Sequence, residues 1–237
     1  MSLCRRLGIY VLAVMLIVSI SSFYLCRKGE ESKMVAYMEH KYGESFSVME
    51  SYAGQLGRDY TMFRVRSNDR NQEGILVRAF GTEKISYQDN YLAYLLKEEI
   101  EQQLTRIAGQ SFGECKVFYR IPELVFPEDF PAHMEVDAFL RHPLSRVRVY
   151  VYVRNFLCLQ DIKEKADDFF LQTQNRGYIV GGVISCPLDG EMYEMITEDN
   201  YKGDIYQGYR SAVEAVFSMD ERGKLMYLEW KGETGYE

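Results

Sequence analysis

Hydrophobic and polar positions alternate most regularly between residues 146 and 156, where the chain reads RVRVYVYVRNF. A period of two predicts a strand whose four valines face a core. Shorter alternating or apolar runs at 44–51, 59–67 and 73–81 are separated by the turn-rich stretches AGQLG and NDRNQ. These runs predict a three-stranded antiparallel meander, to which residues 85–89 add a fourth short strand.

A helical period appears twice in the first half of the chain. Residues 32–43 predict a helix that is capped by Ser32 and ends at Gly43. Residues 90–113, capped by Asp89 or Asn90, predict the strongest helix, which we expect to pack on the meander with Leu96, Ile100 and Leu104 in the core. Its apolar positions recur at spacings of three and four: Leu92, Leu95, Leu96, Ile100, Leu104 and Ile107.

The second half of the chain mixes strand and helix patterns. Strands are predicted at 114–121, 178–186 and 191–197, a short helix at 134–142, a longer helix at 159–175, and a hairpin at 213–230. Gly181 and Gly182 interrupt the strand at 178–186, which indicates a bulge or a close backbone approach. The pattern of residues 199–212 fits a helix and a loop equally well. The fold class predicted is α+β, with mainly antiparallel sheets packed against a few helices.

The N-terminal segment predicts a single transmembrane helix. Twenty uncharged residues, LGIYVLAVMLIVSISSFYLC, separate Arg6 from Arg27, which is enough to cross a bilayer as a helix. A signal peptide cleaved after Ser19 and Ser21 is the main alternative. A lipoprotein modified at Cys26 is disfavoured, because Tyr24 and Leu25 are not small. We expect an uncleaved signal anchor over residues 1–28 and a soluble region outside the cell membrane.

Prolines mark the expected domain organisation. Residues 121–133 contain three of the five prolines and form the best candidate for a connection between modules. We therefore expect a helix–meander–helix–strand module at 29–121 and a second α+β module at 122–237. The alternative is that the two form one continuous domain.

Charge excludes one class of partner. Four of the 28 basic residues lie in the first 28 positions, leaving 24 basic against 35 acidic residues, a net charge of −11. Nucleic-acid affinity comes mainly from neutralising phosphates with basic side chains, so nucleic acid is not an expected partner. The hydrophobic fraction of 47% and the charged fraction of 27% are those of a folded globular chain.

No motif in the chain indicates catalysis, a metal or a cofactor. GxSxG, HExxH and phosphate-binding loops are missing from the sequence, and His40, His133 and His142 have no ligand-type neighbours at a useful spacing. Of the cysteines beyond the anchor, Cys115, Cys158 and Cys186, buried free thiols are one interpretation. The other is a disulfide between Cys158 and Cys186, if strands 146–154 and 178–186 are parallel neighbours joined by the helix at 159–175.

The polar side of the strand at 146–154 is the candidate binding face. It consists of Arg146, Arg148, Tyr150, Tyr152 and Arg154. One interpretation is an exposed sheet face whose side chains pair with acidic neighbours. The other is a binding surface, because tyrosine and arginine dominate interface hot spots. An anionic envelope ligand or an acidic protein would be the matching partner.

Two stretches, YMEHKYGESFSVMES and DNYLAYLLKEEIEQQL, resemble uncharacterised membrane-anchored extracytoplasmic proteins of low-GC Gram-positive bacteria. The resemblance covers the first half of the soluble region and implies an extracytoplasmic location, with no activity or site residues. The expected function is a non-enzymatic, membrane-anchored binding module of the cell envelope. The alternatives are an envelope hydrolase without a recognisable motif and an accessory or sensory subunit of a membrane complex.

Overall fold

The computed structural model describes Met15 and residues 27–52, 59–81, 84–154, 158–201 and 211–232. Of the anchor predicted over residues 1–28, only Met15, Arg27 and Lys28 lie within these residues. None of the helices in the described ranges is both long enough and apolar enough to span a bilayer. The chain forms two compact units: the first contains Met1–Asp89 and Pro127–Ala132, and the second contains Asn90–Phe126 and His133–Glu237.

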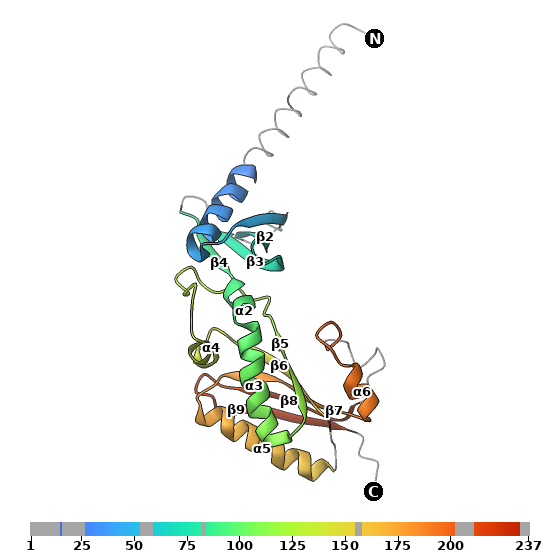
Figure 1. The fold of residues 1–237 in the computed structure, drawn as a ribbon. Helices are drawn as coiled ribbons and strands as arrows, with labels where there is room; N and C mark the ends of the chain where they lie inside the picture. The colour runs from blue at the N-terminus through green and yellow to red at the C-terminus, as the bar shows by residue number, and fades with distance from the viewer. Residues whose placement is uncertain are drawn as a thin grey trace, which may run out of the picture. The chain divides into compact units, whose positions relative to one another are not determined.

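Apart from Met15, the described residues of the first unit form one helix and one antiparallel sheet with their connecting segments. The helix covers residues 27–42, so Ser32 lies within it and does not cap it, and Gly43 follows with a positive φ of 69°. The predicted meander and its fourth strand are confirmed, with the strands in chain order (Figure 1). They are β1 (Phe46–Tyr52), β2 (Tyr60–Ser67), β3 (Gln72–Phe80) and β4 (Ser86–Asp89).

The second unit contains a five-stranded sheet and five helices among the described residues. The strands are β5 (Cys115–Arg120), β6 (Val147–Val153), β7 (Val180–Pro187), β8 (Ser211–Met219) and β9 (Leu225–Gly232), again in chain order. Neighbouring strands are antiparallel except β6 and β7, which are parallel. The helices are α2 (Tyr91–Leu95), α3 (Lys97–Phe112), α4 (Val136–Arg141), α5 (Leu159–Asn175) and α6 (Gly190–Met195). The α+β class with mainly antiparallel sheets is thus confirmed.

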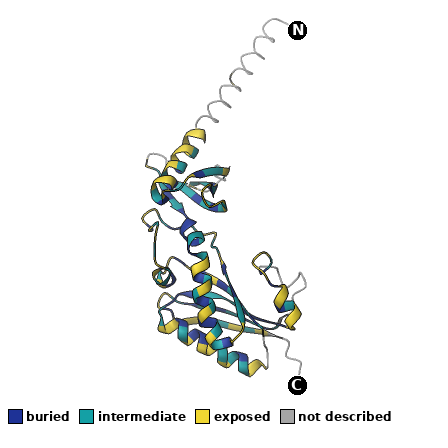
Figure 2. Cartoon of the chain, in the orientation of Figure 1, coloured by how far each residue is buried: buried dark blue, intermediate teal, exposed yellow. Residues whose placement is uncertain are grey.

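One face of the five-stranded sheet forms the core of the second unit. The alternation in β6 behaves as predicted, since Val147, Val149, Val151 and Val153 are all buried. On the same face the Phe169 and Phe170 rings of α5 lie 6.1 and 5.1 Å from the Phe217 ring of β8. Figure 2 shows α3 and α5 with buried sides toward the sheet and exposed sides away from it.

The long predicted helix is present, but its packing partner differs from the expectation. Leu96, Ile100 and Leu104 are buried as predicted. However, Leu96 breaks the helix into α2 and α3, and α3 packs on β5 and α5 instead of the meander. The helix and β5 therefore belong to the second unit, so the compact units divide after Asp89 and not at the expected boundary of 121/122.

Two further expectations change. The short helix α6 (Gly190–Met195) forms where a strand was predicted at 191–197, because the Asp189 carboxylate accepts a hydrogen bond from the Met192 N–H and starts a helical turn. The disulfide considered for Cys158 and Cys186 is not formed. Cys158 is exposed and caps α5 through its Sγ, whereas Cys186 is buried.

The predicted close approach at the glycine pair is confirmed. Gly182 lies opposite Val149 in the parallel β6–β7 pair. A Cβ atom at Gly182 would lie 1.9 Å from the Val149 carbonyl oxygen, so only glycine fits there without moving a strand.

Candidate functional site

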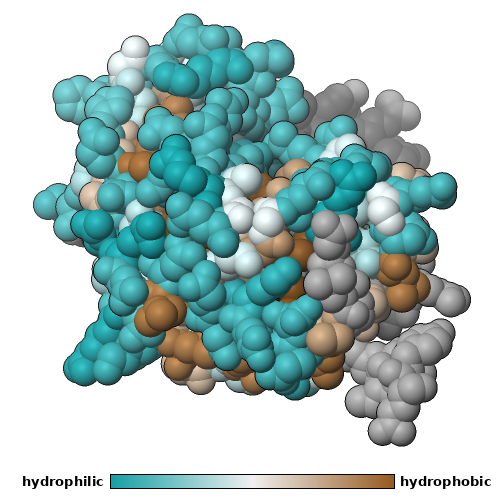
Figure 3. Space-filling view, turned by 60° about the horizontal axis from the view of Figure 1, so that its bottom comes forward, coloured by the Kyte–Doolittle hydropathy of each residue, from teal (hydrophilic) through white to brown (hydrophobic). Residues whose placement is uncertain are grey.

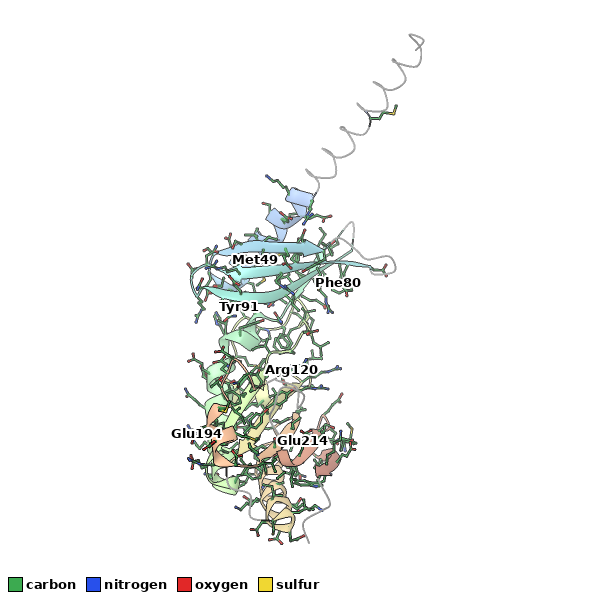
Figure 4. All side chains as sticks on the ribbon, turned by 90° about the vertical axis from the view of Figure 1, so that its right-hand side faces the viewer. Met49, Phe80, Tyr91, Arg120, Glu194 and Glu214 are labelled. Carbon is green, nitrogen blue, oxygen red and sulfur yellow. The ribbon has the colours of Figure 1, made fainter. Side chains whose placement is uncertain are left out.

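The face of the five-stranded sheet opposite α3 and α5, here called the outer face, carries most of the predicted site residues. Strand register places its side chains in three rows across the sheet. The first row is Arg120, Arg148, Gly181, Ser218 and Tyr227; the second is Phe118, Tyr150, Val183, Val216 and Glu229; the third is Lys116, Tyr152, Ser185, Glu214 and Lys231. Figure 4 labels Arg120 of the first row and Glu214 of the third.

Residues 190–201, called the 190–201 segment, occupy part of this face. The Tyr201 ring stacks on Phe118 with ring centroids 4.8 Å apart and planes inclined by 9°. It also meets the edge of Tyr150 at 5.4 Å, and the Tyr152 hydroxyl donates a hydrogen bond of 2.7 Å to the Tyr201 carbonyl. Two of the predicted site residues, Tyr150 and Tyr152, therefore hold a segment of the chain itself.

Cationic side chains fix the other end of the 190–201 segment. Lys116 Nζ donates to the Tyr193, Glu194 and Ile196 carbonyl oxygens at 2.8, 3.3 and 3.0 Å, which satisfies the C-terminal carbonyls of α6. Arg154 forms ion pairs with Glu114 and Glu194. Sequence reasoning listed Arg154 as a binding residue, but its guanidinium already has two carboxylate partners inside the unit.

Three other arginines lie in or next to strands β5 and β6, namely Arg120, Arg146 and Arg148. Arg120 at the end of β5 lies directly opposite Arg148 of β6, and both are exposed. Arg146 precedes β6 and has a φ of +43°, so strand alternation does not place it on the outer face. Within the described ranges, none of these three side chains makes a hydrogen bond or an ion pair. Sequence reasoning missed Arg120, because only the strand register reveals that it faces Arg148.

Raised pKa values indicate that several tyrosine and cysteine side chains of the second unit are neutral. Burial raises the pKa of Tyr193 to about 12, and it raises the pKa of Tyr201 further. Burial likewise raises the pKa of Cys115 to about 11 and of Cys186 to about 12, so neither thiol has the lowered pKa of a reactive cysteine.

A second polar cluster lies in the first unit, around a buried carboxylate. Asp89 is fully buried and accepts hydrogen bonds from the Tyr42 hydroxyl at 2.5 Å and the Tyr37 hydroxyl at 3.1 Å. Lys41 Nζ completes the cluster at 2.8 Å, and its side chain is only 10% exposed. Burial and the Asp89 charge raise the pKa of Tyr37. All these groups satisfy one another, so the cluster joins the helix at 27–42 to β4.

Other surface features offer less chemistry. A shallow depression on α3 is lined by Glu98, Glu101, Gln102, Thr105 and Arg106. Glu101 in it already accepts from the Tyr119 N–H and the Lys97 ammonium. The face drawn in Figure 3 is mostly hydrophilic with scattered hydrophobic patches. In the described ranges, no group of three or more histidine, cysteine or acidic side chains is arranged to hold a metal ion.

Comparison with known proteins gives one structural likeness. No protein-family model and no curated protein sequence matches the chain. A crystal structure of a DUF5037 family protein from Ruminococcus gnavus ATCC 29149 is similar with a TM-score of 0.43 and 16% sequence identity. The match covers 83% of this chain and 94% of the other.

Proposed function

We propose that the protein is a non-enzymatic, membrane-anchored, extracytoplasmic binding module that engages an anionic partner through the outer face of its five-stranded sheet. The observation that carries this proposal is the pair Arg120 and Arg148, which face each other on neighbouring strands without a carboxylate partner among the described residues. Like charges placed directly opposite on antiparallel strands are destabilising. An anionic partner would relieve this repulsion.

Arg106 and Arg146 also have no ion-pair partner among the described residues, so the direct opposition of Arg120 and Arg148 is the feature that supports the proposal, in contrast to the arginines that are paired. Arg64, Arg70 and Arg154 each form an ion pair with a glutamate. Acidic residues outnumber basic ones in this chain, 35 to 28, so carboxylates are available to neutralise exposed arginines. Because Arg120 and Arg148 face each other without such a partner among the described residues, they favour binding to another molecule over a role in stabilising the fold.

The proposed binding is tested by photo-crosslinking in intact cells. A photoreactive aromatic amino acid replaces Tyr227, which lies in the same row as Arg148 and is 46% exposed. The control position is Leu171 on α5, which is 54% exposed on the helical side of the sheet. We expect adducts at position 227 that disappear when Arg120 and Arg148 are both replaced by alanine. Equal adduct formation at the two positions would contradict binding at the outer face.

The proposed topology gives a separate prediction. Because the apolar segment is long enough to span a bilayer and lacks a good cleavage site, protease added to intact cells should remove the acidic region and leave a membrane-bound N-terminal fragment. The measurement is immunoblotting with tags at each end of the chain. Recovery of a fully secreted form that starts near Ser22 would show that the segment is a cleaved signal peptide.

A further inference from the structure

We propose that Arg120 and Arg148 bind the phosphate group of a small phosphate ester, which lies on the outer face beside Gly181 and Ser218. This inference rests on the proposed binding function and names the chemistry of the ligand. The four residues belong to one row across β5, β6, β7 and β8.

The number of donors favours phosphate over carboxylate. One arginine fork satisfies both oxygens of a carboxylate in a bidentate pair. Arg120 and Arg148 are cross-strand neighbours, whose Cβ atoms lie about 4.5–5.5 Å apart in such pairs. Two forks at this spacing match a tetrahedral group that offers three or more oxygens to donors on different sides.

The rest of the row places no side chain directly beside Arg148 on β7 and supplies a further donor. Gly181 follows Arg148 in the row and has no side chain above the sheet. A Cβ atom at Gly181 would lie 3.2 Å from the Phe217 carbonyl oxygen and 3.4 Å from Ser218 Cα, which is tighter than ordinary van der Waals contact, so β8 borders this position closely. The next position is Ser218, whose hydroxyl is half-buried and can donate to a phosphate oxygen.

The neighbouring row suits the organic part of an ester. Tyr150 and Val183 lie next to this site along their strands, and both are half-buried. Because the Tyr201 ring already meets Tyr150 at 5.4 Å, the carbon side of a sugar or polyol would lie on Val183 and on the part of Tyr150 that Tyr201 leaves exposed. The ester is therefore expected to bind more tightly than inorganic phosphate.

Net charge argues for a small ligand over a polyanion. The chain beyond the N-terminal segment carries eleven more acidic than basic residues, so its field repels an extended polyanion or an anionic membrane surface. A ligand with one phosphate needs only the local positive charge of the arginine pair.

Isothermal titration calorimetry on the full chain in uncharged detergent tests the proposal. The probes are glucose 1-phosphate, inorganic phosphate, glucuronate and polyphosphate. We expect glucose 1-phosphate to bind more tightly than the other three. Arg120→Ala and Arg148→Ala should each weaken binding by about tenfold to a hundredfold, the range expected for losing hydrogen bonds to a charged group. Ser218→Ala should cause a smaller loss.

The matched control is Arg106→Ala, which removes an exposed arginine of α3 whose side chain donates a hydrogen bond to Gln103. It should leave the affinity unchanged. Two results would overturn the phosphate assignment: no heat with any phosphate probe, or equal affinity in wild type and both row variants. If glucuronate binds more tightly than the phosphate probes, the ligand carries a carboxylate and not a phosphate. If adducts at position 227 persist despite such a result, the binding function stands and only the ligand chemistry is wrong.

Discussion

Replacing Asp89 by asparagine is expected to lower the free energy of unfolding of the first unit by about 3–5 kcal/mol, the usual cost of removing one partner from a buried ion pair. The substitution keeps the shape of the side chain but leaves the Lys41 ammonium without its counter-charge, at a position where only 10% of the lysine side chain is exposed. The Tyr37 and Tyr42 hydroxyls also lose a charged acceptor.

The measurement for Asp89→Asn is urea unfolding followed by circular dichroism, with the two units analysed as separate transitions. Asp59→Asn is the matched control, because Asp59 is an exposed acidic residue of the same unit. It should change stability by less than about 0.5 kcal/mol, as is typical of surface substitutions. Equal midpoints for the two variants would mean that the buried cluster does not stabilise the unit.

Replacing Gly182 by alanine should destabilise the second unit by about 3 kcal/mol or more, at or above the upper end of the usual cost of overpacking. The added Cβ would lie 1.9 Å from the Val149 carbonyl oxygen, and the clash is with backbone, which no side-chain rotation relieves. The β6–β7 pair lies inside the sheet, so its separation would disturb neighbouring strands as well.

Thermal unfolding of Gly182→Ala checks this expectation, with Gly109→Ala as the control. A Cβ atom at Gly109 meets no atom within 4 Å, and the residue lies inside α3. Alanine there should stabilise the unit by about 0.5–1 kcal/mol, because it restricts the unfolded chain and favours a helix. A melting temperature for Gly182→Ala at or above that of the wild type would show that the strands separate easily.

The secondary structure was largely predictable because it depends on local patterns. The alternating valines of β6 and the three-and-four spacing in α3 report directly which side of each element is buried. The exception is α6, which begins after the Asp189 cap. A run of seven residues is too short for its pattern to distinguish a helix from a strand.

The candidate site was only partly predictable, because its decisive contacts join distant residues. Local pattern identified Arg148 and Tyr150 but gave no sign that Tyr201, about fifty residues later, would cover Tyr150. The opposition of Arg120 and Arg148 depends on the register between two strands that are separated by a proline-rich stretch and α4. Asp89 posed a similar problem, since its sequence position suggested a helix cap while its partners lie near residue 40.

Both sheets contain their strands in the order in which the chain supplies them. No described strand has to enter between two strands that are already paired. Each new strand can therefore add to a free edge as it emerges, first in the β1–β4 sheet and then in the β5–β9 sheet. The β6–β7 step joins parallel strands and therefore needs a crossover connection, which α5 provides. Such an order suits a chain that is delivered from its N-terminus and folds while the remainder is still being supplied.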